Sequence, residues 1–222
     1  MEGRIISRRK LSLFTLLLVV LVLLLGLELG GYFWDINHEV NSWVPHSNSI
    51  VARLFTGSVD IIVILYIILV PLYFLYKTRR LPEDYVLAII SIITAMIIVA
   101  LLKIIVGEPR PGASALHYSV STAIWNLDYF SFPSGHTARA TVIAWYLGKR
   151  RSLAVKVLLG VWVIGIAASR LVVSAHWFSD VVTSLDLGVI VCFIIDRTEL
   201  KWIKLYNKLI KPFPVLRVEE QD

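Results

Sequence analysis

The sequence predicts an all-α integral membrane protein, a bundle of six transmembrane helices with both termini in the cytoplasm. Three observations support this fold class. The 222 residues are 57% hydrophobic and only 17% charged, whereas soluble domains are usually about 45–50% apolar and about 25% charged. The mean hydropathy is +0.75, and long apolar stretches recur with basic residues gathered between them. So few charges cannot cover a water-exposed surface, which excludes intrinsic disorder, a disulfide scaffold and a nucleic-acid-binding module.

Six segments meet or approach the roughly 20 apolar residues that cross about 30 Å of hydrocarbon. They are residues 11–32, 58–76, 85–106, 136–148, 154–173 and 180–196, of which 136–148 is short. The first segment follows three basic residues, as a signal peptide would. Its apolar run is long, however, and no A-x-A cleavage site follows, so we expect a retained anchor. No internal repeat divides the chain, and we treat residues 1–222 as a single membrane-embedded domain.

Basic residues set the expected orientation. The N-terminus, the 77–84 loop, the 149–156 turn and the 197–222 tail carry four, three, four and six of them, 17 of the 22 lysines and arginines. The positive-inside rule then places both termini in the cytoplasm, so the basic excess requires no nucleic-acid partner. Helically spaced lysines in the tail suit a helix on the anionic inner leaflet, or a plain solvated face. Trp34 and Trp43 suit an interfacial belt on the outer side.

A second set of residues lies near the predicted outer ends of these segments. Its members are Lys103, Arg110, Ser134, Gly135, His136, Arg170, His176 and Asp180. Because the third and fifth segments run outward and the fourth and sixth run inward, all eight meet at the same membrane face. Ionisable groups beside hydrocarbon are costly, which makes them candidates for function.

Elementary chemistry suggests what this set could do. The three cations suit a phosphoryl dianion, and the free N–H groups at a helix start after Ser134 attract anions. Asp180 lies one helical turn after His176 and can hold its tautomer, so that the other ring nitrogen attacks phosphorus. His136 could then protonate the leaving oxygen.

Two other readings of these residues stay open at this stage. The Ser-Gly-His run alone could be a simple helix cap. A His and Asp four apart could also bind a metal, but three nearby cations would repel it, so we expect no metal.

The same residues give the sequence a resemblance. It resembles the type 2 phosphatidic acid phosphatase (PAP2) superfamily of membrane lipid phosphatases, whose signatures are K-x6-R-P, P-S-G-H and S-R-x5-H-x3-D. Here they read Lys103 to Arg110-Pro111, Pro133 to His136, and Ser169-Arg170 through His176 to Asp180. Every fixed position matches, within a motif core of residues 103–180. Inside the superfamily, the chain resembles the polyprenyl (undecaprenyl or dolichyl) diphosphate phosphatases.

The resemblance implies a role for each matching position. His176 would be the nucleophile that forms a phosphohistidine, Asp180 its orienting partner, and His136 the acid and later the base. The implied phosphate-binding residues are Lys103, Arg110, Ser134, Gly135 and Arg170. Ser169 matches as well, with helix packing as its alternative role. The resemblance implies no metal and no cofactor, and vanadate should inhibit as a phosphate mimic.

We therefore expect a lipid phosphatase of the cell membrane whose active site faces outward and converts a polyprenyl diphosphate to the monophosphate. The motifs recognise phosphate and not the lipid tail, so phosphatidic acid, phosphatidylglycerol phosphate and diacylglycerol pyrophosphate stay open as substrates. A lipid phosphotransferase stays open too, as does a transporter, although a transporter would spread its charges through the midplane. The expected partners are the lipid substrate and membrane lipids, with the oligomeric state left open.

Further residues carry weaker expectations. Arg139 and Asp186 could pair inside the bundle and fix the fourth segment beside the sixth. Glu28 and Asp60, near the outer ends of their segments, could reach only headgroup water. Aromatic residues of the 112–132 loop could cover the phosphate, grip a lipid chain or anchor at the interface; they are Tyr118, Trp125, Tyr129 and Phe130. Residues expected to be merely interfacial or apolar are His38, His46, His117 and Cys192.

Overall fold

The computed structural model describes residues 8–47, 49–113, 126–213 and 216–218. Its helices are α1 (Arg8–Leu29), α2 (Trp34–Trp43), α3 (Ile50–Thr78), α4 (Glu83–Val106), the short 3-10 helix η1 (Leu127–Tyr129), α6 (Gly135–Gly148), α7 (Leu153–Val172), α8 (Phe178–Arg197) and α9 (Glu199–Leu209). Within the described ranges the β-structure is one isolated bridge between Pro109 and Phe130. The predicted all-α class is confirmed.

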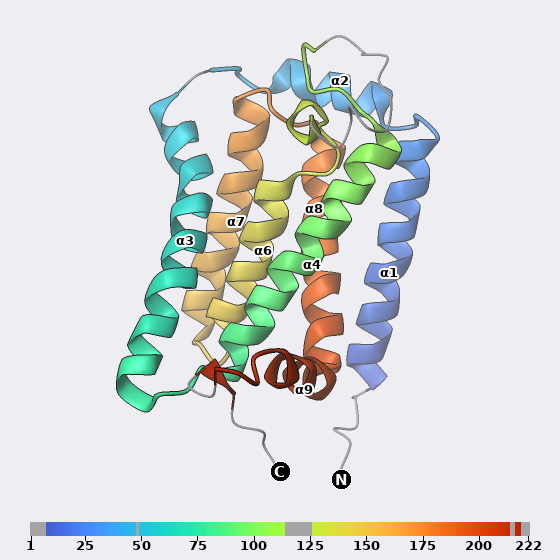
Figure 1. The fold of residues 1–222 in the computed structure, drawn as a ribbon. Coiled ribbons are helices and arrows are strands. Elements are labelled where there is room, and N and C mark those ends of the chain that lie inside the picture. The colour runs from blue at the N-terminus through green and yellow to red at the C-terminus, as the bar shows by residue number, and fades with distance from the viewer. Residues whose placement is uncertain (1–7, 48, 114–125, 214–215, 219–222) are drawn as a thin grey trace.

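Five of these helices are long and apolar enough to cross a membrane, namely α1, α3, α4, α7 and α8. The sixth predicted segment is α6, which has 14 residues and is about 21 Å long at 1.5 Å per residue. Figure 1 shows α6 running alongside the longer helices inside the bundle. A crossing by α6, and hence a total of six, stays a prediction.

Helices α6 and α8 form the centre of the bundle. Helix α6 packs on α8, α4 and α7, while α1 packs on α8 and α3 packs on α7. Close packing of α6 on α8 relies on small residues: Ala138 and Ala140 are fully buried, and a side-chain carbon at Gly188 would lie 2.7 Å from Thr141 Cβ. Small residues at such contacts let helix backbones approach, which is how membrane helices gain packing energy.

Helices α2 and α9 lie across opposite ends of the bundle (Figure 1). Helix α9 confirms the predicted helix in the tail. Its Ile203 is buried against the bundle, whereas its lysines are exposed. The chain after α9 folds back on it, because Tyr206 donates to the Leu216 carbonyl at 3.1 Å and Asn207 exchanges two hydrogen bonds of 3.0 Å with Val218.

An ion-pair cluster fixes the α9 end of the bundle. Lys149, just after α6, contacts Asp84 of α4 at 3.0 Å and Asp196 of α8 at 2.8 Å. Asp196 also accepts hydrogen bonds from Trp145 and Tyr146. These contacts tie α4, α6 and α8 together at the end opposite to the motifs.

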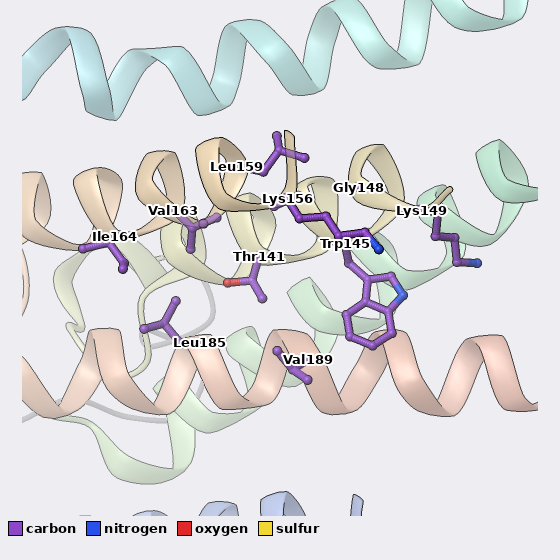
Figure 2. Close-up of a pocket in the computed structure, with 12 residues that line it drawn as sticks. Thr141, Trp145, Gly148, Lys149, Lys156, Leu159, Val163, Ile164, Leu185 and Val189 are labelled. Atoms are coloured by element: carbon purple, nitrogen blue, oxygen red, sulfur yellow. The ribbon is translucent and has the colours of Figure 1, made fainter. Parts of the chain in front are cut away.

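A cavity of about 550 Å³ lies between α6, α7 and α8 near this same end. Figure 2 shows apolar side chains of these helices around it, including Leu159, Val163 and Leu185, with Lys149 and Lys156 near one end. None of the side chains that line the cavity is a histidine or a carboxylate. This cavity is therefore separate from the candidate active site.

Candidate active site

His176 and Asp180 form a buried pair at the start of α8. Their Nδ1 and Oδ2 atoms lie 3.0 Å apart, and the two residues are 3% and 0% exposed. His176 precedes the helix, yet the contact forms because Asp180 Oδ2 also accepts from the Trp177 backbone N–H at 2.8 Å and so caps the first turn. A ring whose Nδ1 bonds to a carboxylate keeps Nε2 free. Burial lowers the pKa of His176, which favours the neutral ring.

The start of α6 lies against this pair. Ser134 caps α6 by accepting from the Thr137 backbone N–H, and its own N–H donates to the Asp180 carbonyl at 3.3 Å. At Gly135 a side-chain carbon would lie 3.2 Å from Met96 Cε, so α4 approaches α6 closely at this residue. The helix start thus brings free backbone N–H groups beside the histidine, an arrangement suited to an anion.

His136 contacts a carboxylate that sequence reasoning placed elsewhere. Its Nε2 lies 3.4 Å from Asp60 Oδ2, and Asp60 Oδ1 lies 2.8 Å from Arg139 Nη1. Asp60 belongs to α3 and is the only charged residue of the predicted segment 58–76, which was the signal available in the sequence. Our expectation that Asp60 reaches only headgroup water is wrong.

The expected pair between Arg139 and Asp186 is also wrong. Arg139 lies against Asp60 of α3, while both carboxylate oxygens of Asp186 are buried without a hydrogen-bond partner among the described residues. The helical register explains this outcome, because Arg139 lies one turn after His136 and faces α3 with it.

The three cations of the set are held at the same end. Lys103, 8% exposed, donates to the Phe130 carbonyl, and Arg170 donates to Thr56 at 3.4 Å. Lys103 interacts electrostatically with Arg110, Arg170 and Asp180. His136 interacts in the same way with Arg170 and His176. The structure therefore brings the three motifs together.

Two guanidinium nitrogens in this cluster have no acceptor among the described residues. The Nε atoms of Arg110 and Arg170 are buried and make no hydrogen bond within the described residues. Buried N–H groups are nearly always paired in folded proteins, so these two donors indicate a site for an anion.

Sequence reasoning missed two carboxyl groups beside the site, Glu28 and Glu108. Glu28 was expected in headgroup water but is 9% exposed. Glu108 lies inside the first motif, between its fixed positions, and Ser131 donates to it at 3.0 Å. Among the described residues, no group of three or more His, Cys, Asp or Glu is arranged to hold a metal ion. Metal-independent chemistry stays a prediction.

A family model described as the PAP2 superfamily matches residues 84–204, more than half of the chain and all three motifs. The chain belongs to the PAP2 superfamily. The resemblance drawn from the motifs is thereby confirmed.

Two curated relatives of this PAP2 protein act on polyprenyl-linked phosphates by name. The chain is 31% identical over 117 residues to decaprenylphosphoryl-5-phosphoribose phosphatase of Mycobacterium tuberculosis, a match that covers 53% of this chain and 62% of the relative. It is 25% identical over 180 residues to undecaprenyl-diphosphatase BcrC of Bacillus subtilis, covering 80% of this chain and 86% of the relative. The chain thus matches less than two thirds of the length of the mycobacterial protein.

Two solved structures share the fold of this PAP2 protein. A transmembrane PAP2-type phosphatidylglycerolphosphate phosphatase from Bacillus subtilis superposes with a TM-score of 0.62 at 22% identity, covering 90% of this chain and 98% of that one. LpxE of Aquifex aeolicus superposes with a TM-score of 0.54 at 20% identity, covering 74% and 94%.

The remaining sequence-based expectations fall around the PAP2 motifs. Phe130 is 1% exposed and anchors the segment before α6, whereas His117, Tyr118 and Trp125 lie outside the described residues. The ring of His38 packs against that of Trp177 in a tilted arrangement, with ring centres 4.8 Å apart. His46 bonds to Ser174 at 2.7 Å. Within the described residues, neither His38 nor His46 hydrogen-bonds to His176, and Cys192 is buried, as expected.

Proposed function

We propose that this PAP2 protein is a membrane lipid phosphatase that hydrolyses a polyprenyl diphosphate to the monophosphate through a phosphohistidine, with its active site facing outward. The observation that carries the proposal is the juxtaposition of two features. A buried histidine bonded through Nδ1 to Asp180 lies among cations, and two of those cations have buried N–H donors without acceptors in the part of the chain that the structure describes. A nucleophile beside an empty anion site suits transfer of a phosphoryl group.

In the first step, His176 Nε2 attacks the terminal phosphorus. The N–P bond forms as the bond to the bridging oxygen breaks, and His136 gives a proton to the departing lipid phosphate. Lys103, Arg110 and Arg170 neutralise the equatorial oxygens with the N–H groups that follow Ser134 and Gly135. Asp180 stabilises the charge that develops on the His176 ring.

In the second step, water hydrolyses the phosphohistidine. His136 takes a proton from the water, whose oxygen attacks phosphorus while the N–P bond breaks. Inorganic phosphate leaves and both histidines return to their starting states. Asp60 contacts His136 Nε2 and so orients the ring with Nδ1 toward the reacting oxygen.

The choice of a polyprenyl tail rests on the relatives. Both curated proteins described above carry polyprenyl-linked phosphates in their names, whereas the two solved structures below 25% identity support the fold alone. The outward orientation of the site rests on the distribution of basic residues, which are concentrated at the opposite end of the bundle.

The test is phosphate release by the purified protein in detergent with EDTA, with a polyprenyl diphosphate, phosphatidic acid and phosphatidylglycerol phosphate offered in parallel. We expect fastest release from the diphosphate, loss of activity in His176→Ala and inhibition by vanadate. His46→Ala is the matched control, because His46 is exposed and its hydrogen bond in the described residues is to Ser174, outside the motifs. Release abolished by EDTA would overturn the metal-free route, and faster release from another lipid would overturn the substrate.

Two further measurements separate the alternatives. Adding a lipid or sugar alcohol and analysing the products distinguishes hydrolysis from phosphotransfer to that hydroxyl. Offering the substrate to sealed vesicles of known orientation tests the side, since an outward-facing site releases phosphate only from the outer leaflet.

A further inference from the structure

Glu108 lies next to Asp180, the carboxylate partner of His176. Helix α4 ends at Gly107, whose left-handed backbone (φ 65°) turns the chain. Glu108 follows this turn and is held by Ser131, whose hydroxyl donates to the Glu108 carboxyl at 3.0 Å and whose N–H donates to the Glu108 carbonyl at 2.8 Å. Glu108 is half-buried, so these two hydrogen bonds hold its carboxyl group in place at the edge of the site.

The two oxygens of Asp180 have unequal surroundings. Oδ2 accepts from His176 Nδ1 and from the Trp177 N–H. Oδ1 receives no hydrogen bond from an N–H or hydroxyl group of the described residues, although Asp180 is 0% exposed. A buried carboxylate oxygen without a donor costs on the order of 1–3 kcal/mol or more. Asp180 therefore needs one more donor.

The Glu108 carboxyl lies within hydrogen-bonding reach of Asp180. Two carboxyl groups in such contact cannot both ionise favourably, so one of them carries a proton. Glu108 is the one that carries it, because Asp180 Oδ2 already accepts two hydrogen bonds and burial raises the pKa of Glu108. A proton on Glu108 supplies the donor that Oδ1 lacks.

A second acidic group of the described residues also faces Glu108. Glu28 of α1 contacts both Glu108 and Ser179 through its side chain, and Ser179 is held by two hydrogen bonds to Asn37, of 2.9 and 3.0 Å. Burial and the neighbouring charges of Asp180 and Glu28 raise the pKa of Glu108 to about 10. At neutral pH, Glu108 is therefore an acid that keeps its proton.

We propose that Glu108 is a positioning residue whose neutral carboxyl donates a hydrogen bond to Asp180 Oδ1. This hydrogen bond holds the Asp180 carboxylate with Oδ2 against His176 Nδ1. It also disfavours transfer of the Nδ1 proton from the imidazole ring to Asp180. Glu108 touches neither substrate nor the reacting atoms. The role in catalysis rests on the proposed phosphatase function, whereas the position of the proton does not.

The kinetic test compares Glu108→Gln with Glu108→Ala. Glutamine keeps an N–H donor for Asp180 and an oxygen for Ser131, so kcat should stay within about threefold of wild type. Alanine leaves Asp180 Oδ1 unpaired and should lower kcat by about 10–100-fold with little change in KM, the usual effect of losing a partner that orients a reacting group. The matched controls are Glu39→Gln and Glu39→Ala on α2, where Glu39 is exposed and both should match wild type.

The pH profile separates positioning from a merely structural role. In the wild type, kcat should fall as pH rises through about 10, because Glu108 then loses its proton and adds a second negative charge beside Asp180. The ratio of kcat in Glu108→Gln to kcat in the wild type should therefore increase across this range. An equal loss of kcat in the Gln and Ala variants, or a constant ratio, would overturn the proposal.

An infrared spectrum tests the proton without any activity. At pH 7 the difference between wild type and Glu108→Gln should contain the carbonyl band of a protonated carboxylic acid, and the absence of this band would overturn the proposal. If the variant does not accumulate, the wild-type band should disappear as pH rises through about 10. A band without phosphate release from any lipid would overturn the proposed function and leave the position of the proton standing.

Discussion

Replacing Arg170 by alanine should remove most of the stabilisation of the charge that develops on the transferred phosphoryl group. Arg170 is 7% exposed. Its Nη1 donates to Thr56 at 3.4 Å, which orients the guanidinium, while its Nε has no acceptor among the residues that the structure describes and is available to the substrate. The substitution therefore removes at least one charged donor that is already in place before the substrate arrives.

The magnitude follows from that geometry. Loss of one preorganised donor to a developing oxyanion costs about 10²–10³ in kcat, or roughly 2.7–4 kcal/mol, and we expect Arg170→Ala to fall in this range. Arg170→Lys keeps the charge but loses the fork that reaches both Thr56 and the phosphoryl oxygens. Its kcat should lie between those of wild type and alanine.

The assay is phosphate release under saturating lipid in detergent, with folding checked by thermal unfolding of each variant. Arg53→Ala is the matched control, because Arg53 is an exposed arginine near the start of α3 and outside the motifs. Arg170→Ala activity within threefold of wild type would refute the assignment of Arg170 to the phosphate site. An equal loss of kcat in Arg53→Ala would refute the conclusion that the effect of Arg170→Ala arises at the phosphate site.

Three further outcomes are expected. Asp60→Asn should lower kcat by about 10-fold or more with the fold intact, because the ring of His136 loses its orienting carboxylate; unchanged kcat would contradict this. The acid limb of kcat/KM should lie below pH 6.5, since burial lowers the pKa of His176 and the neutral nucleophile is lost only as pH falls through that lowered value; a limb above pH 6.5 would contradict it. Gly188→Ala should destabilise the bundle by about 1–3 kcal/mol in a denaturant titration, because the added carbon meets α6 at 2.7 Å, whereas Gly160→Ala, with nothing within 4 Å, should be neutral.

Helix positions were predictable where a long apolar run ends at a strong signal. The 85–106, 154–173 and 180–196 segments match α4, α7 and α8 within a few residues, because glycine, proline or charge marks their ends. The start of α3 was predicted eight residues late, since Arg53, Thr56 and Gly57 interrupt the apolar pattern. Helix α2 was read only as an interfacial stretch with Trp34 and Trp43, both of which are exposed.

The candidate site, like the helices, could be predicted from the sequence only in part. Motif residues such as His176 and Lys103 were placed from sequence because they flank segment ends, and alternating direction brings those ends together. The contacts of Asp60, Glu28 and Glu108 could not be predicted, because the rotation of each helix about its axis decides which neighbour a side chain contacts. A single charge in an apolar run fixes no such rotation, which is also why Arg139 was assigned to the wrong helix.

Helix α1 packs against α8, and under the proposed mechanism this contact links activity to the order in which the helices are synthesised. Helix α1 is the first described helix to be translated and α8 is the last long one, yet Glu28 and Asp180 belong to one cluster. A nascent chain that has inserted α1 to α7 holds the cations of the site without the histidine–carboxylate pair. Under the proposed mechanism, such an intermediate would bind lipid phosphates without cleaving them, and hydrolysis would begin only when α8 has docked.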